Sequence, residues 1–165
     1  VTDKINIWTV YSFGIVERED ELQTYFPHYD RRHNFNLLLS YKLNILTLKN
    51  LEFSIRWNYG SGFPFTKTQA YYEEINFSNG SDINNLNGDL GIIYSDLNSG
   101  RLPDYHRLDV SIKHKIVFNQ FGDLEWALGI TNLYNRENIF YYDRVQAVRI
   151  NQLPIIPSFG INWIF

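Results

Sequence analysis

The stretch that decides the fold is LPIIPSFGINWIF, residues 153–165. From Ser158 onward, large apolar side chains alternate with positions that are mostly small or polar. This alternation is typical of a β-strand with one apolar face. Such a strand fits two architectures. In a soluble sandwich the apolar face would be the core, and in an outer-membrane β-barrel it would face lipid.

The composition excludes several classes of protein. The chain has no cysteine, which excludes disulfides and thiolate metal sites, and its net charge of −3 provides no basic field for nucleic acid. The sequence has no apolar run long enough for a membrane-spanning helix. Aromatic residues make up 17% of the chain, a surplus that suits the interfacial girdles of a barrel but also occurs in soluble β-proteins.

Five other segments alternate in the same way and predict strands at residues 5–15, 34–43, 51–59, 105–118 and 124–131. The connections between the six strands alternate between long and short. Segments 17–33, 66–103 and 132–151 are expected to be long loops, with a strand extension through residues 70–75. Segments 44–50 and 119–123 are expected to be short turns.

Parity divides the side chains of these strands between two faces. Lys42, Arg56, Arg107, Asp109, Lys113 and Glu125 fall on the polar face. For the membrane interpretation, twelve apolar side chains are predicted to face lipid: Phe35, Leu37, Leu39, Phe53, Ile55, Val110, Ile112, Trp126, Leu128, Phe159, Ile161 and Trp163. Periodicity alone does not separate this interpretation from a sandwich. A single-chain membrane barrel needs about eight strands or more, so six strands predict either part of a larger barrel or copies that pool their strands.

Several strings resemble one family. RLPDYHRLDVSIKHKI (101–116), WALGITNLYNRENIFYY (126–142) and LPIIPSFGINWIF look like the last three strands of TonB-dependent outer-membrane receptors, particularly those of Bacteroidetes, and WNYGSGFPFT (57–66) resembles the preceding outward strand. The resemblance covers residues 34–165. It implies an antiparallel transmembrane β-barrel of roughly 22 strands filled by a plug. This chain (1–165) would supply about six C-terminal strands, and the plug and the earlier strands would be absent.

The resemblance also implies a function and partners. The whole protein would bind and import a scarce nutrient, such as a siderophore, vitamin, glycan or peptide, with energy from TonB acting through the missing N-terminal part. Its partners would be membrane lipid, the rest of the barrel with its plug, the outer-membrane assembly machinery and a surface lipoprotein. The C-terminus would lie on the periplasmic side of the bacterial outer membrane. The alternative is a structural or adhesive β-sheet protein without transport activity, built as a soluble sandwich or an oligomeric barrel.

Three sets of side chains are candidates for function. Tyr71, Tyr72 and Phe77 in a long loop could stack on the rings of a ligand. Arg56, Arg107, Asp109 and Lys113 are expected to face the lumen, where Arg107 and Asp109 could neutralise each other or bridge to the plug. In the family that the chain resembles, the last strand is an assembly signal, here Phe159, Ile161, Trp163 and Phe165.

Metal and catalytic chemistry are weakly indicated. The four histidines, His28, His33, His106 and His114, do not have the spacing of a metal site. Residues 81–89 contain Asp82, Asn84, Asn87 and Asp89, oxygen ligands suited to calcium, but they lack the EF-hand glycine, and a solvated turn is the simpler interpretation. Nucleophile, base and orienting group do not occur together. The prediction is a protein that is not an enzyme and has no cofactor.

Overall fold

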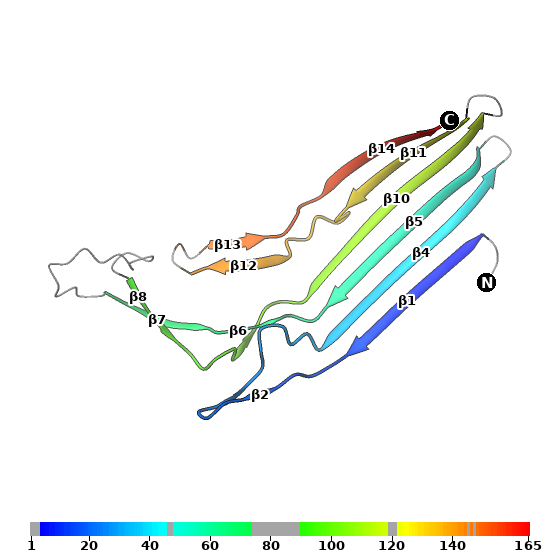
Figure 1. Ribbon diagram of the computed structural model, residues 1–165. Helices are drawn as coiled ribbons and strands as arrows, with labels where there is room; N and C mark the ends of the chain where they lie inside the picture. Colours follow the sequence, from blue (N-terminus) through cyan, green and yellow to red (C-terminus); the bar gives the residue numbers. More distant parts are fainter. Residues whose placement is uncertain (1–3, 46–47, 74–89, 119–121, 145, 147) are drawn as a thin grey trace.

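The computed structural model shows an all-β chain (Figure 1). The structure describes residues 4–45, 48–73, 90–118, 122–144, 146 and 148–165, and the sheets formed in these ranges are all antiparallel. Across these same ranges, no helix has the length and apolarity to cross a membrane.

Six strands form the main sheet, and they lie in the sheet in the same order as along the chain. The predicted strand positions agree with the observed ones to within a few residues, and the connections alternate long and short as expected. The all-β, antiparallel part of the fold prediction is therefore confirmed. The strands are β1 (Ile5–Phe13), β4 (His33–Ile45), β5 (Leu48–Gly60), β10 (Tyr105–Phe118), β11 (Gly122–Thr131) and β14 (Ile156–Ile164).

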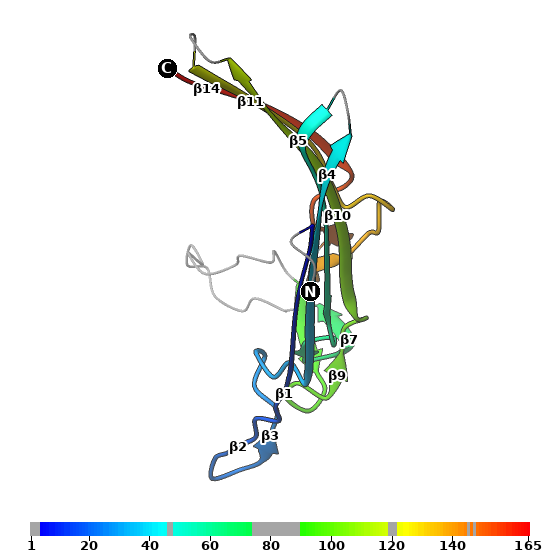
Figure 2. The same ribbon diagram turned by 90° about the vertical axis from the view of Figure 1, so that its right-hand side faces the viewer.

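The main sheet is a single curved layer when it is viewed edge-on (Figure 2). Its outer strands are β1 and β14, and each of them pairs with one neighbour within the sheet. The last residues of β4 and β10 and the first residues of β5 and β11 lie together at one end of the sheet, which we call the short-turn end, and the described parts of the three long connections lie at the other end (Figure 1). The sheet is open, with two edges.

The long connections contain small hairpins, which corrects the prediction that they are loops. β2 (Arg18–Glu19) pairs with β3 (Thr24–Tyr25), and β6 (Pro64–Phe65) pairs with β9 (Gly100–Arg101). β7 (Thr68–Glu73) pairs with β8 (Leu90–Tyr94), and β12 (Ile139–Asp143) pairs with β13 (Val148–Asn151). Of these strands, only β7 was partly predicted, as the extension through residues 70–75. The others span only two to five residues, which is too short for an alternating pattern to stand out in the sequence.

Backbone register decides which side chains share a face, because residues directly opposite each other in a sheet point to the same side. All twelve of the predicted lipid-facing residues lie on one face. One row across this face consists of Ile7, Leu39, Ile55, Val110 and Ile130.

The opposite face carries the polar residues. Its middle row is made almost entirely of small side chains, and Ser40 Oγ lies 3.2 Å from Ser54 Oγ within it. The charged side chains lie above and below this row on the same face. The members of the row are Asn6, Ser40, Ser54, Ser111, Gly129 and Ser158.

The apolar face is uncovered. Among the residues that the structure describes, no hydrophobic side chain is buried, and Ile7, Phe159 and Ile161 are 60%, 65% and 63% exposed. A soluble sandwich would bury such a face against a second sheet. The six-stranded sheet therefore has one broad apolar face whose side chains are exposed.

The first residue of β11 must be glycine. Gly122 has a φ of +88°, and a Cβ there would lie 2.1 Å from the backbone oxygen of Ile164. We expect Gly122→Ala to lower the free energy of unfolding by roughly 1–3 kcal/mol, through backbone strain and displacement of the end of β14. The measurement is urea unfolding of the full-length protein, followed by tryptophan fluorescence.

Gly160→Ala is the matched control for this substitution. It lies in β14, opposite Ala127, and an added Cβ meets nothing within 4 Å. Its unfolding midpoint should stay close to that of the wild type. Equal losses of stability in the two variants would contradict the strain argument.

Candidate functional site

The four side chains predicted to face the lumen lie on the polar face of the sheet, on two neighbouring strands. Arg56 of β5 is directly opposite Asp109 of β10, and Arg107 is two residues before Asp109. Arg107 Nη2 lies 3.0 Å from Asp109 Oδ2, so these two residues form the neutralising pair that the sequence suggested. Lys113 lies further along β10, and its Nζ is 2.9 Å from Glu125 Oε1.

The two ends of the polar face differ in charge. At the short-turn end, positive and negative side chains alternate in the register, and Lys115 Nζ lies 2.6 Å from Asp123 Oδ2, beside the pair of Lys113 with Glu125. At the end with the long connections, arginines gather instead. The row of serines and glycine separates the two regions.

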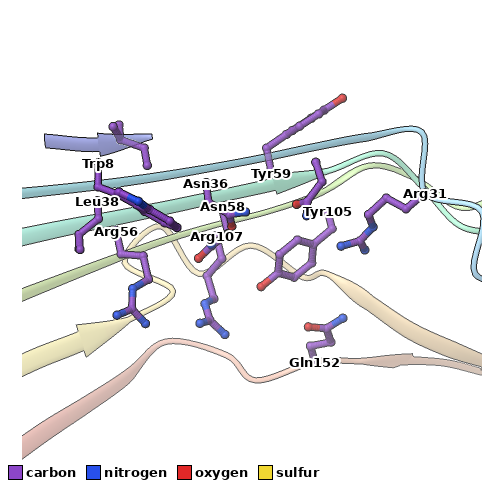
Figure 3. Close-up of a pocket in the computed structure, with 12 residues that line it drawn as sticks. Trp8, Arg31, Asn36, Leu38, Arg56, Asn58, Tyr59, Tyr105, Arg107 and Gln152 are labelled. Carbon is purple, nitrogen blue, oxygen red and sulfur yellow. Dashed lines mark hydrogen bonds between the residues drawn. The ribbon is translucent and has the colours of Figure 1, made fainter. Parts of the chain in front are cut away.

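A cavity of about 660 Å³ occupies the arginine-rich end of this face. Arg56 and Arg107 extend into it from β5 and β10, Tyr105 lies next to them, and Gln152 approaches from the segment before β14 (Figure 3). Asn36 and Asn58 line it from β4 and β5 and are hydrogen-bonded to each other. The volume is in the range of small-molecule sites.

A third arginine reaches the cavity from a long connection. Arg31 lies between β3 and β4, and its guanidinium carbon is 4.1 Å from the ring centroid of Phe63 and 5.7 Å from that of Tyr105. These aromatic rings hold the side chain against the rim of the sheet through cation–π contact. The Nε atoms of Arg31 and Arg107 are buried and have no hydrogen-bond partner.

The connection that carries Arg31 is fixed by its neighbour Asp30, which is only 1% exposed. The carboxylate accepts hydrogen bonds from the Val16 amide, at 3.0 Å, and from the Arg101 guanidinium. Arg101 also donates to the Gly62 carbonyl oxygen, at 3.1 Å. Burial by itself would raise the pKa of Asp30, but the Val16 hydrogen bond and the charges of Arg101 and Arg32 lower the pKa below its ordinary value of 3.8.

The asparagines of the segment ITNLYNREN join the last long connection to the sheet. Asn132 is fully buried, and its Nδ2 donates to the carbonyl oxygens of Arg136 and Leu153, each at 3.0 Å. Its backbone amide donates to Asp109 Oδ1 at 2.9 Å, so the carboxylate that pairs with Arg107 is also held from this loop. The φ of +56° at Asn132 is a conformation that asparagine tolerates better than most residues. The sequence pattern alone does not predict this role for the asparagines.

Two of the three aromatic residues predicted to contact substrate, Tyr71 and Tyr72, are not among the residues that line the cavity. Tyr71 and Tyr72 lie on β7 and are 45% and 47% exposed. The Tyr71 hydroxyl donates to the Arg144 carbonyl oxygen at 2.9 Å, which joins two of the long connections. Phe77 and the calcium candidates at residues 81–89 lie outside the described residues.

The predicted assembly residues lie on one face along β14 and beyond its end. Phe159, Ile161 and Trp163 are 65%, 63% and 53% exposed, and Phe165 is fully exposed. Trp163 also stacks on Phe118 of β10, with the ring centroids 6.3 Å apart. A row of exposed aromatic and aliphatic side chains thus follows one edge of the sheet.

Three of the four histidines lie on the apolar face beside aromatic rings. His33 Nδ1 lies 2.9 Å from the Tyr11 hydroxyl, His106 Nδ1 lies 2.7 Å from the Tyr134 hydroxyl, and the ring of His114 is edge-on to that of Trp126. In the part of the chain that the structure describes, His, Asp and Glu do not gather in groups of three or more that could hold a metal.

Removing the charge of Asp30 should loosen the connection that positions Arg31. Asp30→Asn leaves the Arg101 guanidinium without its counter-charge. We expect a local loss of about 2–3 kcal/mol, below the value for a fully buried pair because the Arg101 side chain is 30% exposed. Hydrogen–deuterium exchange of residues 14–32 in the full-length protein measures this. The exposed residue Asp20 is the control, and Asp20→Asn should change exchange by about 0.5 kcal/mol or less.

The pH dependence of the same contact has a definite sign. The folded pKa of Asp30 lies below its ordinary value of 3.8, so its stabilisation is complete above that pH and is lost as the pH falls through the folded pKa. The difference in protection between wild type and Asp30→Asn should shrink as the pH is lowered below 3.8. A difference that stays constant to low pH would contradict the role of the carboxylate charge.

Comparison with known proteins adds no relative to this description. No protein-family model matches the chain, and no similar protein is found among curated proteins or solved structures.

Proposed function

We propose that this chain supplies six strands to a larger antiparallel β-barrel of the outer membrane, and that the whole protein is a TonB-dependent transporter that imports a scarce nutrient. The sheet is a single curved layer with an open edge at β1 and another at β14. In a barrel of roughly 22 strands, both edges would be paired by neighbouring strands, because barrel closure satisfies every backbone group.

The observation that carries the proposal is the layering of the apolar face. At the end with the long connections, the ring of Trp57 lies near those of Phe35 on the neighbouring strand and Tyr59 on its own strand, at centroid distances of 5.6 and 6.1 Å. At the short-turn end, Phe118 stacks on Trp163. Between them lie aliphatic rows, such as the one through Leu39 and Ile55. Two aromatic girdles around an aliphatic band are the surface of an outer-membrane barrel.

The dimensions of this band fit a membrane. Along β10 it runs from His106 to Ile116, which is roughly 33 Å of strand at about 3.3 Å per residue. A strand tilt of about 40° reduces this to a height of ~25 Å, the thickness of the apolar band on such barrels. An exposed face of this height made mostly of aliphatic and aromatic side chains would promote aggregation in water.

The opposite face has the character of a lumen wall. Arg56, Arg107 and Asp109 lie on it next to a row of serines. We place the three long connections outside the cell and the two short turns in the periplasm, as in known barrels. The C-terminal end of β14 then lies on the periplasmic side, and the plug that would contact TonB lies in another part of the protein.

Substitution by arginine on the two faces tests the membrane assignment. Ile55→Arg places a charge in the aliphatic band and should cost roughly 2–4 kcal/mol if it lies near the bilayer midplane. The control Ser54→Arg is one residue away and faces the polar side, so its cost should be much smaller. Urea unfolding in lipid vesicles and the amount of protein in outer-membrane fractions measure both variants.

Two results would contradict the membrane assignment. One is that both variants fold in vesicles with the stability of the wild type. The other is that the wild type stays soluble and monodisperse without detergent, which would instead support the structural or adhesive sheet protein.

Single cysteines test the sidedness, because the natural chain has no cysteine. Leu22 is 92% exposed between β2 and β3, and Asn44 lies near the short-turn end of β4. Leu22→Cys should react with a large membrane-impermeant maleimide on intact cells, and Asn44→Cys should react only after permeabilisation. The reverse pattern would invert the topology.

A further inference from the structure

We infer that the arginine-rich cavity binds a small ligand carrying an oxyanion group, either a carboxylate or a phosphate. This inference rests on the proposed function only in taking the polar face as a lumen wall and the ligand as cargo. The binding chemistry itself follows from the side chains of the cavity.

The first argument is charge. Three arginines, Arg31, Arg56 and Arg107, line the cavity, and no aspartate or glutamate is among its described lining residues. Asp109 offsets one of these charges through its pair with Arg107. The ion pairs between described residues include neither Arg31 nor Arg56. An anion entering the cavity would therefore relieve repulsion among the guanidinium groups.

The second argument is the contrast with the other end of the same face. There Lys113 and Lys115 pair with Glu125 and Asp123, and the charges cancel. The short-turn end has a smaller cavity of about 290 Å³, lined by both signs of charge. The excess of positive charge is thus confined to the larger cavity, beneath the long connections.

The third argument is that the arginines are held in place before a ligand arrives. Arg31 is stacked on Phe63, and Arg107 is held by Asp109, which the buried Asn132 fixes in turn. Groups fixed in this way lose little conformational freedom on binding.

The fourth argument is the type of side chain. A guanidinium group presents a planar fork of donors that matches the two oxygens of a carboxylate or a phosphate. The other polar side chains that line the cavity are neutral, and they include the amides of Asn58 and Gln152 and the hydroxyl of Tyr105. These suit the neutral hydroxyl or carbonyl groups of the same ligand. A cavity of about 660 Å³ has room for a ligand of metabolite size.

The test is calorimetric titration of the full-length protein in detergent with two probes, inorganic phosphate and the tricarboxylate tricarballylate. Saturable binding of either probe supports the site, and the probe that binds tells whether phosphate or carboxylate is preferred. Arg56→Gln should weaken binding roughly tenfold or more, as expected for the loss of hydrogen bonds to a charged group. Arg56 is the best target because none of the described ion pairs involves it, so its removal strands no partner.

Two further variants sharpen this test. Arg56→Lys keeps the charge but loses the planar fork, and its affinity should lie between those of the wild type and Arg56→Gln. Lys115→Gln removes the same charge from the opposite end of the polar face and should leave affinity unchanged. A thermal unfolding curve for each variant verifies that it is folded.

Binding of neither probe to the folded wild type would overturn the inference. Equal loss in Arg56→Gln and Lys115→Gln would also overturn it, because such a loss would reflect only net charge. A different measurement tests the proposed function: absence of the wild type from outer-membrane fractions would contradict it. Binding by a protein that is not in the membrane would support the anion site and overturn its assignment to transported cargo.

Discussion

The backbone ladder that runs without a break from β1 to β14 is the constraint on which the rest of the structure depends. Side chains of a strand alternate between its faces, so a shift of one residue in any of the five pairings would move apolar side chains to the polar face. The observed register keeps the five pairings in phase, except for one irregularity between β4 and β5 that lies at Leu43 and Ile45, at the end of β4. An aliphatic row through Ile55 and Val110 and a serine row through Ser54 and Ser111 are consequences of the same pairing of β5 with β10.

The long connections at one end of the main sheet are held in place by a different kind of interaction. The buried polar side chains at this end, among the described residues, are Asp30, Asn132 and Asn138. Buried polar groups are stable only when their hydrogen bonds are satisfied. Asp30 binds Val16 and Arg101, and Asn132 binds Arg136 and Leu153. Directional hydrogen bonds therefore do for the long connections what a hydrophobic core does in a soluble domain, and they set the positions of Arg31 and Asp109 at the cavity.

The polar face combines two electrostatic environments on one continuous sheet. The cross-strand pairs of lysine with glutamate or aspartate cancel at the short-turn end. At the opposite end the acidic partners are fewer than the arginines, and the cavity is left positive. A row of mostly small, uncharged side chains, which includes Ser54 and Ser111, separates the two regions.

The sequence by itself determined the strands of the main sheet, their antiparallel order and the face to which each side chain points. These follow from a period of two, which is local information that residues such as Phe53, Ile55 and Trp57 carry. It also placed Arg56, Arg107, Asp109 and Lys113 on one face. The tertiary structure alone decided which of them share a cavity. Arg31 and Gln152 come from irregular connections far from β5 in the chain, and the hairpins of those connections are too short to show a period. Their positions depend on buried hydrogen bonds between segments that are distant in sequence, such as Asp30 with Arg101, and no local pattern encodes such a contact.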